Sequence, residues 1–304
     1  MLFANPIAAE CPLALACLNQ AKNSGLRFVS IQLPDEWMPP EEGKALELAD
    51  IRPLALRAPS SLGLGTSDFR EAEWEKWIHT LSALSPDGQK LILHGSPIPL
   101  GLIFEYLDKR PTDFHALGDF KSAYIEKIMQ QVQQIKGMAD EYGIQLYLEN
   151  AHMGGEAYFE PGRTLLYPSL RTPRHLLQIA ETMGIGICFN SANARITSNA
   201  LTYMHRSRSL FAGATEEEIT GAADSWIDFY QRVKAHTGLI RLSYAISWGD
   251  TPHTTHIPFP ESAYPELIQF AEQVNENIPV ILALRDPKSG LKPMLDVLYQ
   301  LKRS

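Results

Sequence analysis

The sequence has few of the features that mark secreted, membrane or disulfide-rich proteins. Its three cysteines, Cys11, Cys17 and Cys188, form no C-x-x-C pair. So few thiols, odd in number, favour a reducing compartment, and we expect a cytoplasmic protein. No apolar run approaches the roughly 20 residues of a membrane-spanning helix. The segment MLFANPIAAECPLALACL contains no Lys or Arg, and Pro6 and Glu10 interrupt it, so we expect no secretory signal peptide.

Positively charged residues are also fewer than negatively charged ones. The chain has 27 Lys and Arg residues against 35 Asp and Glu residues, a formal net charge of −8. Because nucleic-acid binding depends largely on cationic contacts to phosphate groups, this balance argues against a nucleic-acid partner. The G-x-S-x-G, H-E-x-x-H and P-loop motifs are all missing, which argues against the hydrolase, zinc-protease and nucleotide-binding sites that they mark.

What the sequence does contain is an alternation of short apolar segments with longer segments of helical period. At 304 residues and 45% hydrophobic composition, the chain is long enough for a sizeable core. The helical pattern predicts helices over residues 74–81, 119–143, 172–184, 215–238, 262–275 and 290–304, with Thr215 and Glu218 in capping-box spacing. Eight segments have the character of strands: residues 2–4, 27–33, 52–57, 90–94, 144–149, 184–189, 239–244 and 280–284.

Strands that alternate with helices to a count of eight predict a (β/α)8 TIM barrel, a single domain spanning residues 1–304. An open, doubly wound sheet is the rival architecture. Such a sheet usually has a glycine-rich first turn, and SLGLGTS around Gly63 and Gly65 is a poor match in the wrong place. Residues 97–119 and 191–214 lack a regular pattern, and we expect functional loops there.

Polar residues follow the predicted strands at their carboxyl ends, where barrels carry their ligand sites. In QLYLENAHMGG, for example, an alternating strand ends in Glu149 and Asn150. The predicted catalytic residues are Glu149, His94 and His256. The predicted ligand-binding residues are Arg57, Asn150, Asn190, Asn193, Arg241, Trp248 and Arg285. Further polar candidates near strand ends are Asn5, Gln32, Ser243, Tyr244, Asp250, His253 and Asp286.

A structural role is the alternative for each of these side chains. A histidine at a strand end is often a satisfied structural residue, and His94 alone proves nothing. Glu149 could simply pair with a neighbouring arginine, for which Arg57 and Arg241 are the candidates. Trp226 and Phe229 lie on a helical stripe, and we expect them in the core.

In the order and spacing of these segments, the chain resembles the xylose isomerase-like barrels, a superfamily that includes sugar-phosphate isomerases and epimerases and the type IV apurinic endonucleases. LYLEN at 146–150 looks like the fifth-strand motif, whose Glu is a metal ligand, and LILHGSP at 91–97 looks like the fourth-strand histidine motif. The other similar segments are ICFNSANA at 187–194, LIRLSYA at 239–245, HTTHIPF at 253–259 and VILALRD at 280–286. The resemblance covers most of the chain and implies the barrel fold.

The departures from that family's pattern imply a depleted metal site. Only His94, Glu149 and His256 keep ligand residue types, and they are the expected ligands if a single zinc or manganese ion binds. The residues that stand where the family has acids or histidines are Arg57, Asn190, Asn193, Arg241, Thr254 and Ala283. Guanidinium groups repel a cation and bind carboxylates or phosphates, so we expect no cofactor and an anionic ligand.

These residues and the resemblance lead to three functional hypotheses. The first is an isomerase, epimerase or lyase that moves protons on a small anionic sugar or keto-acid, with Glu149 and His94 as an acid/base pair. The second is a non-catalytic ligand-binding or regulatory protein on a degenerate barrel. The third, an abasic-site endonuclease relative, conflicts with the acidic charge. We expect a small-molecule ligand and no membrane or nucleic-acid partner, and we leave a homo-oligomer open.

Overall fold

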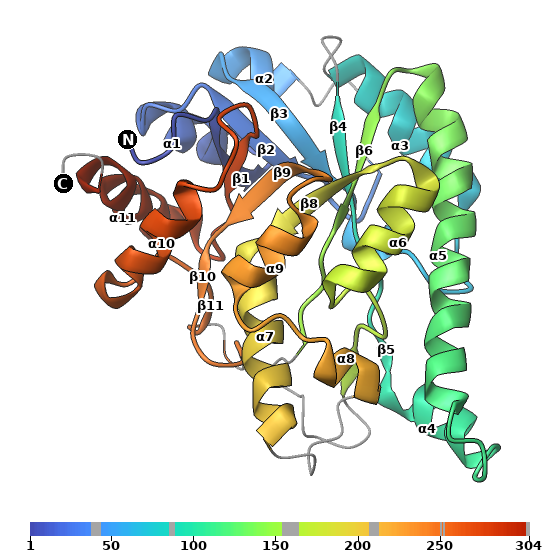
Figure 1. The fold of residues 1–304 in the computed structure, drawn as a ribbon. Helices are drawn as coiled ribbons and strands as arrows, with labels where there is room; N and C mark the ends of the chain where they lie inside the picture. Colours follow the sequence, from blue (N-terminus) through green and yellow to red (C-terminus); the bar gives the residue numbers. More distant parts are fainter. Residues whose placement is uncertain are drawn as a thin grey trace.

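A computed structural model describes residues 1–37, 44–84, 89–153, 164–206, 213–249, 251 and 253–301. Parallel strands close into a barrel in the order β1-β12-β9-β8-β6-β4-β3-β2 (Figure 1). They are β1 (Ile7–Pro12), β2 (Phe28–Gln32), β3 (Arg52–Arg57), β4 (Lys90–Leu93), β6 (Gln145–Glu149), β8 (Gly186–Asn190), β9 (Thr237–Leu242) and β12 (Val280–Leu282). The predicted (β/α)8 barrel is confirmed, and the open doubly wound sheet is excluded.

Helices surround the barrel because each has one apolar face to bury against it. They are α1 (Leu15–Asn23), α2 (Lys44–Ala49), α3 (Glu71–Leu84), α5 (Ala116–Glu141), α6 (Pro173–Met183), α9 (Trp226–Val233), α10 (Tyr264–Ala271) and α11 (Pro287–Gln300), with 3-10 turns η2 (Ser60–Leu62) and η3 (Glu261–Ala263). In α5 the buried stripe includes Ile125, Ile128 and Val132. Trp226 and Phe229 are buried, as predicted. The C-terminal helix α11 packs against α1 and β1 on the outer wall.

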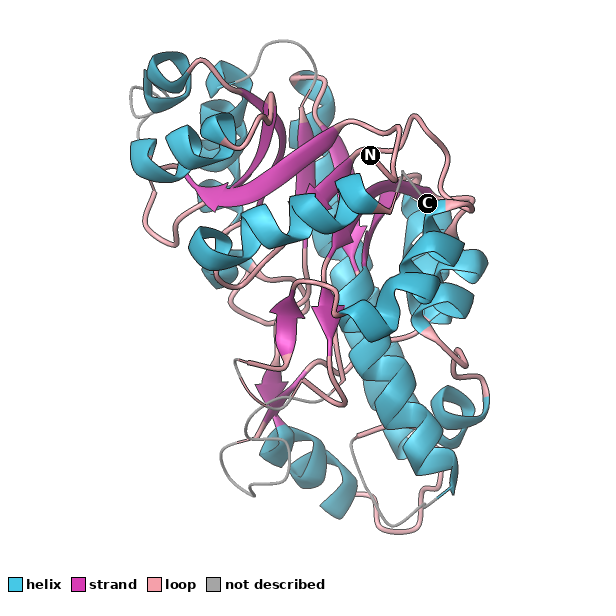
Figure 2. Cartoon of the chain, turned by 90° about the vertical axis from the view of Figure 1, so that its left-hand side faces the viewer, coloured by secondary structure: helices cyan, strands magenta, loops and turns pink. Residues whose placement is uncertain are grey.

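The carboxyl-terminal face of the barrel carries most of the additional structure. It holds α4 (Leu100–Asp108), α7 (Ser191–Arg206), α8 (Glu216–Thr220) and two small antiparallel sheets, β5 (Ile98–Pro99) with β7 (Leu165–Leu166) and β10 (Tyr244–Ala245) with β11 (Thr255–Ile257). In Figure 1 these elements lie below the barrel, and Figure 2 shows the short strands apart from it. Among the helices in the described part, none combines the length and apolar character needed to cross a bilayer.

The first strand is not where the sequence pattern placed it. We predicted residues 2–4, whereas β1 is Ile7–Pro12. The segment contains Glu10, which faces other charged groups inside the barrel and interrupts the apolar pattern that strands usually show. Asn5 therefore precedes the strand, and its Nδ2 donates to the carbonyls of Asn275 and Ile278 at 2.7 Å each. Cys11 also lies in β1.

Three further expectations are corrected. The helix predicted over residues 215–238 is two helices, α8 and α9, because Ser225 caps a new helix by accepting from the amide of Asp228. The irregular stretch 97–119 contains α4, and 191–214 contains α7. Small polar residues such as Ser191, Thr197 and Ser198 are buried in α7, which conceals its apolar stripe in the sequence. The capping box of Thr215 and Glu218 is confirmed.

Candidate functional site

The interior of the barrel is filled by alternating side chains from its strands. The buried apolar layer consists of Ala8, Ala55, Ile92, Cys188, Leu239 and Ile281, with Tyr147 packed against it. Since strand side chains alternate, residues two positions further along face the same interior, nearer the carboxyl ends. Those positions hold Glu10, Arg57, His94, Glu149, Asn190, Arg241 and Ala283. The period of two therefore brings most of the predicted polar residues to one end of the barrel.

Glu149 is the centre of a buried ionic network. Its Oε2 accepts from Nε of Arg57 at 2.8 Å. Its Oε1 accepts from Nδ2 of Asn190 at 2.7 Å and from Nη1 of Arg241. Burial alone would raise the pKa of Glu149, but the charges of Arg241 and Arg57 and these hydrogen bonds hold the pKa well below its usual range. Glu149 is therefore an ionised carboxylate with both oxygens occupied.

The two arginines differ in how much of each guanidinium is used. Arg241 is buried and also donates to Glu10, from Nε to Oε2 at 2.8 Å and from Nη2 to Oε1 at 2.5 Å. Arg57 donates from Nη1 to Oε1 of Gln32 at 2.7 Å, and its side chain remains 21% exposed. No hydrogen bond joins Nη2 of Arg57 to another described residue. Arg57 thus keeps a donor for a ligand, whereas all three guanidinium nitrogens of Arg241 donate to Glu10 or Glu149.

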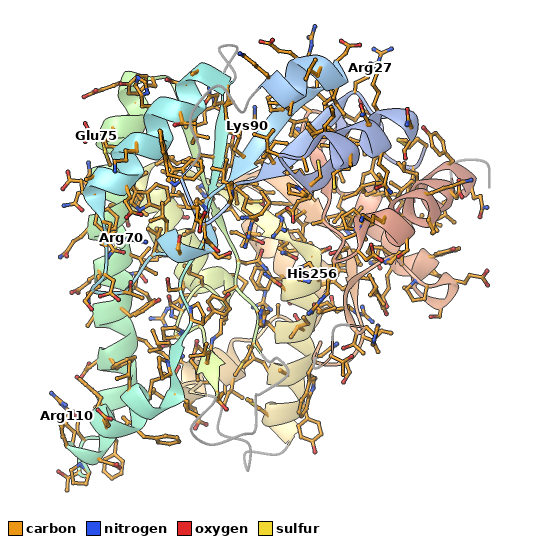
Figure 3. All side chains as sticks on the ribbon, turned by 180° about the vertical axis from the view of Figure 1, so that it is seen from behind. Arg27, Arg70, Glu75, Lys90, Arg110 and His256 are labelled. Atoms are coloured by element: carbon orange, nitrogen blue, oxygen red, sulfur yellow. The ribbon has the colours of Figure 1, made fainter. Side chains whose placement is uncertain are left out.

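A cavity of about 300 Å³ adjoins this network. The predicted residues that line it are Arg57, Glu149, Asn190, Asn193, Arg241, His256 and Arg285. A larger cavity of about 800 Å³ lies between α4 and α5 and has none of the predicted site residues in its lining. Figure 3 labels His256 near the middle of the molecule and Arg110, which lines the larger cavity, at its far end.

His256 enters the cavity from β11 with an unusual backbone. Its φ of 53° lies in the left-handed region, which a non-glycine side chain rarely adopts and which often marks functional sites. Nδ1 lies 2.8 Å from Oγ1 of Thr255, and Nε2 lies 3.4 Å from Nδ2 of Asn190. Because the amide of Asn190 is a donor, Nε2 is the acceptor and the proton sits on Nδ1. Burial and then the charge of Arg241 lower the pKa of His256 to about 3, so the ring is neutral at pH 7.

Asn190 and Asn150 have structural hydrogen bonds that the sequence did not reveal. Oδ1 of Asn190 accepts from the amide of Asn193 at 3.1 Å, which caps the start of α7. Asn150 accepts from the amide of Asn190 at 2.6 Å and donates to the carbonyl of the same residue at 3.0 Å. Asn193 donates to the carbonyl of Asn150 at 2.8 Å. The three asparagines tie β6 to the β8–α7 junction, and Asn150 is not part of the cavity lining defined by the described residues.

Two other predicted residues lie apart from the cavity. His94 ends β4, next to β6, but its ring nitrogens face backbone carbonyls: Nδ1 that of Gly95 at 3.2 Å, and Nε2 that of Pro59 at 3.1 Å. Burial, with the charge of Arg57, lowers the pKa of His94. Trp248 packs against the cluster of Met153, Ala200, Leu201 and Met204, with Tyr203 edge-on to its ring. Within the described part of the chain, neither His94 nor Trp248 lines the cavity. A third candidate from the sequence, Asp250, lies outside the described residues.

Three polar residues of the lining are not among the predicted site residues: Glu10, His152 and Tyr167. Glu10 was missed because β1 was predicted at residues 2–4 instead of Ile7–Pro12. An acid within the apolar segment IAAEC nevertheless indicates a buried charged site. His152 follows Asn150 in QLYLENAHMGG and was visible as a polar residue beyond a strand end. Tyr167 comes just after β7, in a segment without a distinctive pattern, so no local signal pointed to it.

The donor set around Glu149 does not fit a divalent cation. Within the described residues, no group of three or more His, Cys, Asp or Glu side chains converges as metal ligands do. Both oxygens of Glu149, and both of Glu10, already accept from arginine or amide groups. A cation would have to displace guanidinium groups that repel it. No chemical step is therefore assigned to a metal ion.

The comparisons with known proteins identify the fold. No protein-family model matches the chain, and no curated protein matches it in sequence. Among solved structures it is similar to a D-tagatose 3-epimerase-like protein (TM-score 0.62, 15% identity, 98% of this chain and 96% of that one). It is also similar to an AP endonuclease, family 2, from Brucella melitensis (0.59, 12%, 97% and 98%) and to the 3-keto-D-glucoside 4-epimerase of E. coli (0.55, 11%, 99% and 100%). At these identities the likeness shows the fold alone, a closed (β/α)8 barrel.

Proposed function

We propose that the protein binds a small hydroxylated carboxylate, of the size of a sugar acid, through guanidinium groups at the barrel mouth and without a metal ion. The observation that carries this proposal is the occupation of both Glu149 oxygens by Arg57, Arg241 and Asn190. An ionised carboxylate held in this way neutralises and positions the arginine side chains, and it has no free oxygen with which to bind a metal cation.

The charges in the cavity wall favour an anion. Three arginines, Arg57, Arg241 and Arg285, line it together with two carboxylates, Glu10 and Glu149, which leaves one positive charge in excess. Arg57 supplies the contact, because its Nη2 makes no hydrogen bond to another described residue and its side chain is partly exposed. A guanidinium edge matches the geometry of a carboxylate.

Arg57→Ala tests the proposal, because Glu149 keeps its contacts with Arg241 and Asn190 in that variant. Gluconate should raise the melting temperature of the wild-type protein, since a ligand at 100 times its Kd stabilises by about 2.7 kcal/mol. The shift should be lost in Arg57→Ala and retained in Arg70→Ala, a control at an exposed ion pair. The proposal fails if no sugar acid raises the melting temperature of the wild-type protein, or if Arg57→Ala responds as the wild type does.

Proton transfer of the isomerase or epimerase type is a second candidate, supported by His256. Its neutral imidazole lines the cavity in a strained backbone conformation, and two of the structural neighbours are described as an epimerase and an epimerase-like protein. A pKa of about 3 makes His256 a weak base, and Glu149 is weaker still, so binding is the better-supported function. Exchange of the carbon-2 proton of bound gluconate with deuterium, lost in His256→Asn, would establish the catalytic alternative.

A further inference from the structure

We infer that Tyr167 donates a hydrogen bond to an oxygen on carbon 2 of the bound acid, so that the site selects carboxylates oxygenated next to the carboxyl group. This inference rests on the proposed function, because it assumes that an acid occupies the cavity. It adds to that function a specificity-determining residue and a narrower ligand class.

The position of Tyr167 places its ring in the cavity wall. Tyr167 follows β7 and lines the same cavity as Arg57 and Glu149. Its ring meets that of His152 edge to face, with 5.3 Å between centroids and 73° between planes. Since His152 also lines the cavity, the two rings form one part of its wall.

The hydroxyl group of Tyr167 makes no hydrogen bond to another described residue, and it is not among the polar atoms sealed inside the protein. Tyr124 shows the contrast, because its hydroxyl lies 2.7 Å from the carbonyl of Ser96 and 3.0 Å from that of Leu64. Polar groups in protein interiors are usually paired. A phenol that is half-buried in a cavity wall and lacks a protein partner there is therefore suited to a ligand.

The protonation state makes this phenol a donor. Burial raises the pKa of Tyr167, and the negative charge of Glu149 adds to the effect while the positive charge of Arg57 opposes it. The hydroxyl thus keeps its proton at neutral pH. Arg57 and Glu149 line the same cavity as Tyr167.

Arg57 and Tyr167 together present two kinds of donor to one small cavity. The charged Nη2 of Arg57 suits the carboxylate, and the neutral phenol suits the oxygen beside it. In a volume of about 300 Å³, both contacts are satisfied by an acid that carries its oxygen on carbon 2. An acid without that oxygen leaves the phenol unpaired, at a loss of affinity.

The test compares two pairs of acids that differ in the carbon-2 hydroxyl: gluconate with 2-deoxygluconate, and glycerate with 3-hydroxypropionate. Affinities are measured by titration calorimetry on the wild type, on Tyr167→Phe and on Tyr203→Phe, a matched control at an exposed tyrosine on α7. The wild type should bind the 2-hydroxylated acid of each pair about ten-fold more tightly. This ratio should fall to about one in Tyr167→Phe and persist in Tyr203→Phe.

Each outcome of these measurements either supports or overturns the role inferred for Tyr167. A ratio near one in the wild type, or a ratio that persists in Tyr167→Phe, overturns the inference while leaving anion binding intact. Tyr167→Phe should melt at the wild-type temperature without ligand, and a clear drop would mean that the hydroxyl has a structural partner, which also overturns it. Binding of none of the four acids would instead overturn the proposed function.

Discussion

Arg241 on β9 holds Glu10 on β1 by two parallel hydrogen bonds, from Nε to Oε2 at 2.8 Å and from Nη2 to Oε1 at 2.5 Å. In the barrel, β12 stands between these strands, so the pair joins elements that share no backbone hydrogen bonds. The remaining nitrogen, Nη1, contacts Glu149 on β6, beyond β8. A single guanidinium therefore links three strands across the mouth of the barrel.

Glu10→Gln should lower the free energy of unfolding by about 3–5 kcal/mol, because it leaves a buried guanidinium with one charged partner instead of two. Urea denaturation of both proteins measures the difference. Glu73→Gln, at the exposed pair with Arg70, is the control and should change stability by less than about 1 kcal/mol. Equal stability of Glu10→Gln and the wild type would show that the pair contributes little.

Purified protein should carry far less than one zinc or manganese ion per chain. The carboxylates that would bind an ion already accept hydrogen bonds from guanidinium groups. Elemental analysis after gel filtration measures the metal content. Stoichiometric metal that is lost in Glu149→Gln would contradict this prediction and make a metal-dependent isomerase the leading function.

A second buried ionic cluster joins α5, α8 and the segment just before α6. Glu218 on α8 pairs with Lys121 on α5 and with Nη2 of Arg171 at 3.4 Å, and all three side chains are buried. Burial, then the charge of Arg171, lowers the pKa of Lys121 to about 7, against the opposing effect of Glu218. Two cations thus face one carboxylate in this cluster.

The two sides of that cluster should respond unequally to substitution. Glu218→Gln removes the carboxylate that pairs with both Lys121 and Arg171 and should destabilise the fold by about 3–5 kcal/mol, although glutamine preserves the capping box. Lys121→Met removes the surplus charge, keeps the Arg171–Glu218 pair and should be the milder change. Chemical denaturation of the two variants in parallel checks this order, and the reverse order would refute it.

Stability should fall as the pH is lowered from about 6.5 towards 4. Burial lowers the pKa of His175 to about 4 and that of His256 to about 3, from an ordinary value of 6.5. Below pH 6.5 the unfolded chain therefore binds protons that the folded protein excludes, and the free energy of unfolding decreases with falling pH. Each histidine should contribute about 2 kcal/mol of loss at pH 5 relative to pH 7.

Urea titrations at pH 7 and pH 5 measure this loss. His175→Asn should reduce the difference between the two pH values, and His115→Asn, at an exposed position, should leave it unchanged. An identical pH dependence in the wild type and in His175→Asn would argue against the buried neutral imidazole. Below pH 4.5 the paired carboxylates Glu149 and Glu218, whose pKa values are lowered, add a further loss as they become protonated.

The alternation of strands and helices could be predicted because it depends on local periodicity. Segment 144–149 alternates apolar and polar residues, and segment 52–57 is a short apolar run between two arginines, so each strand and its polar end are visible without the rest of the chain. The same period placed Glu149, Arg57 and Arg241 at one end of the barrel. The pairing of Glu149 with arginine was open as an alternative, and the structure shows that both arginines take part.

The sequence by itself determined the barrel and the strand-end positions of its polar residues, because side-chain alternation and helical period are properties of a few consecutive residues. Only the tertiary structure decided which of these side chains share a cavity. It paired Glu10 with Arg241 across the barrel, packed Trp248 away from the cavity and brought Tyr167 into its wall. Such contacts join residues far apart in the chain, and they depend on barrel closure and on loop paths that local patterns do not specify.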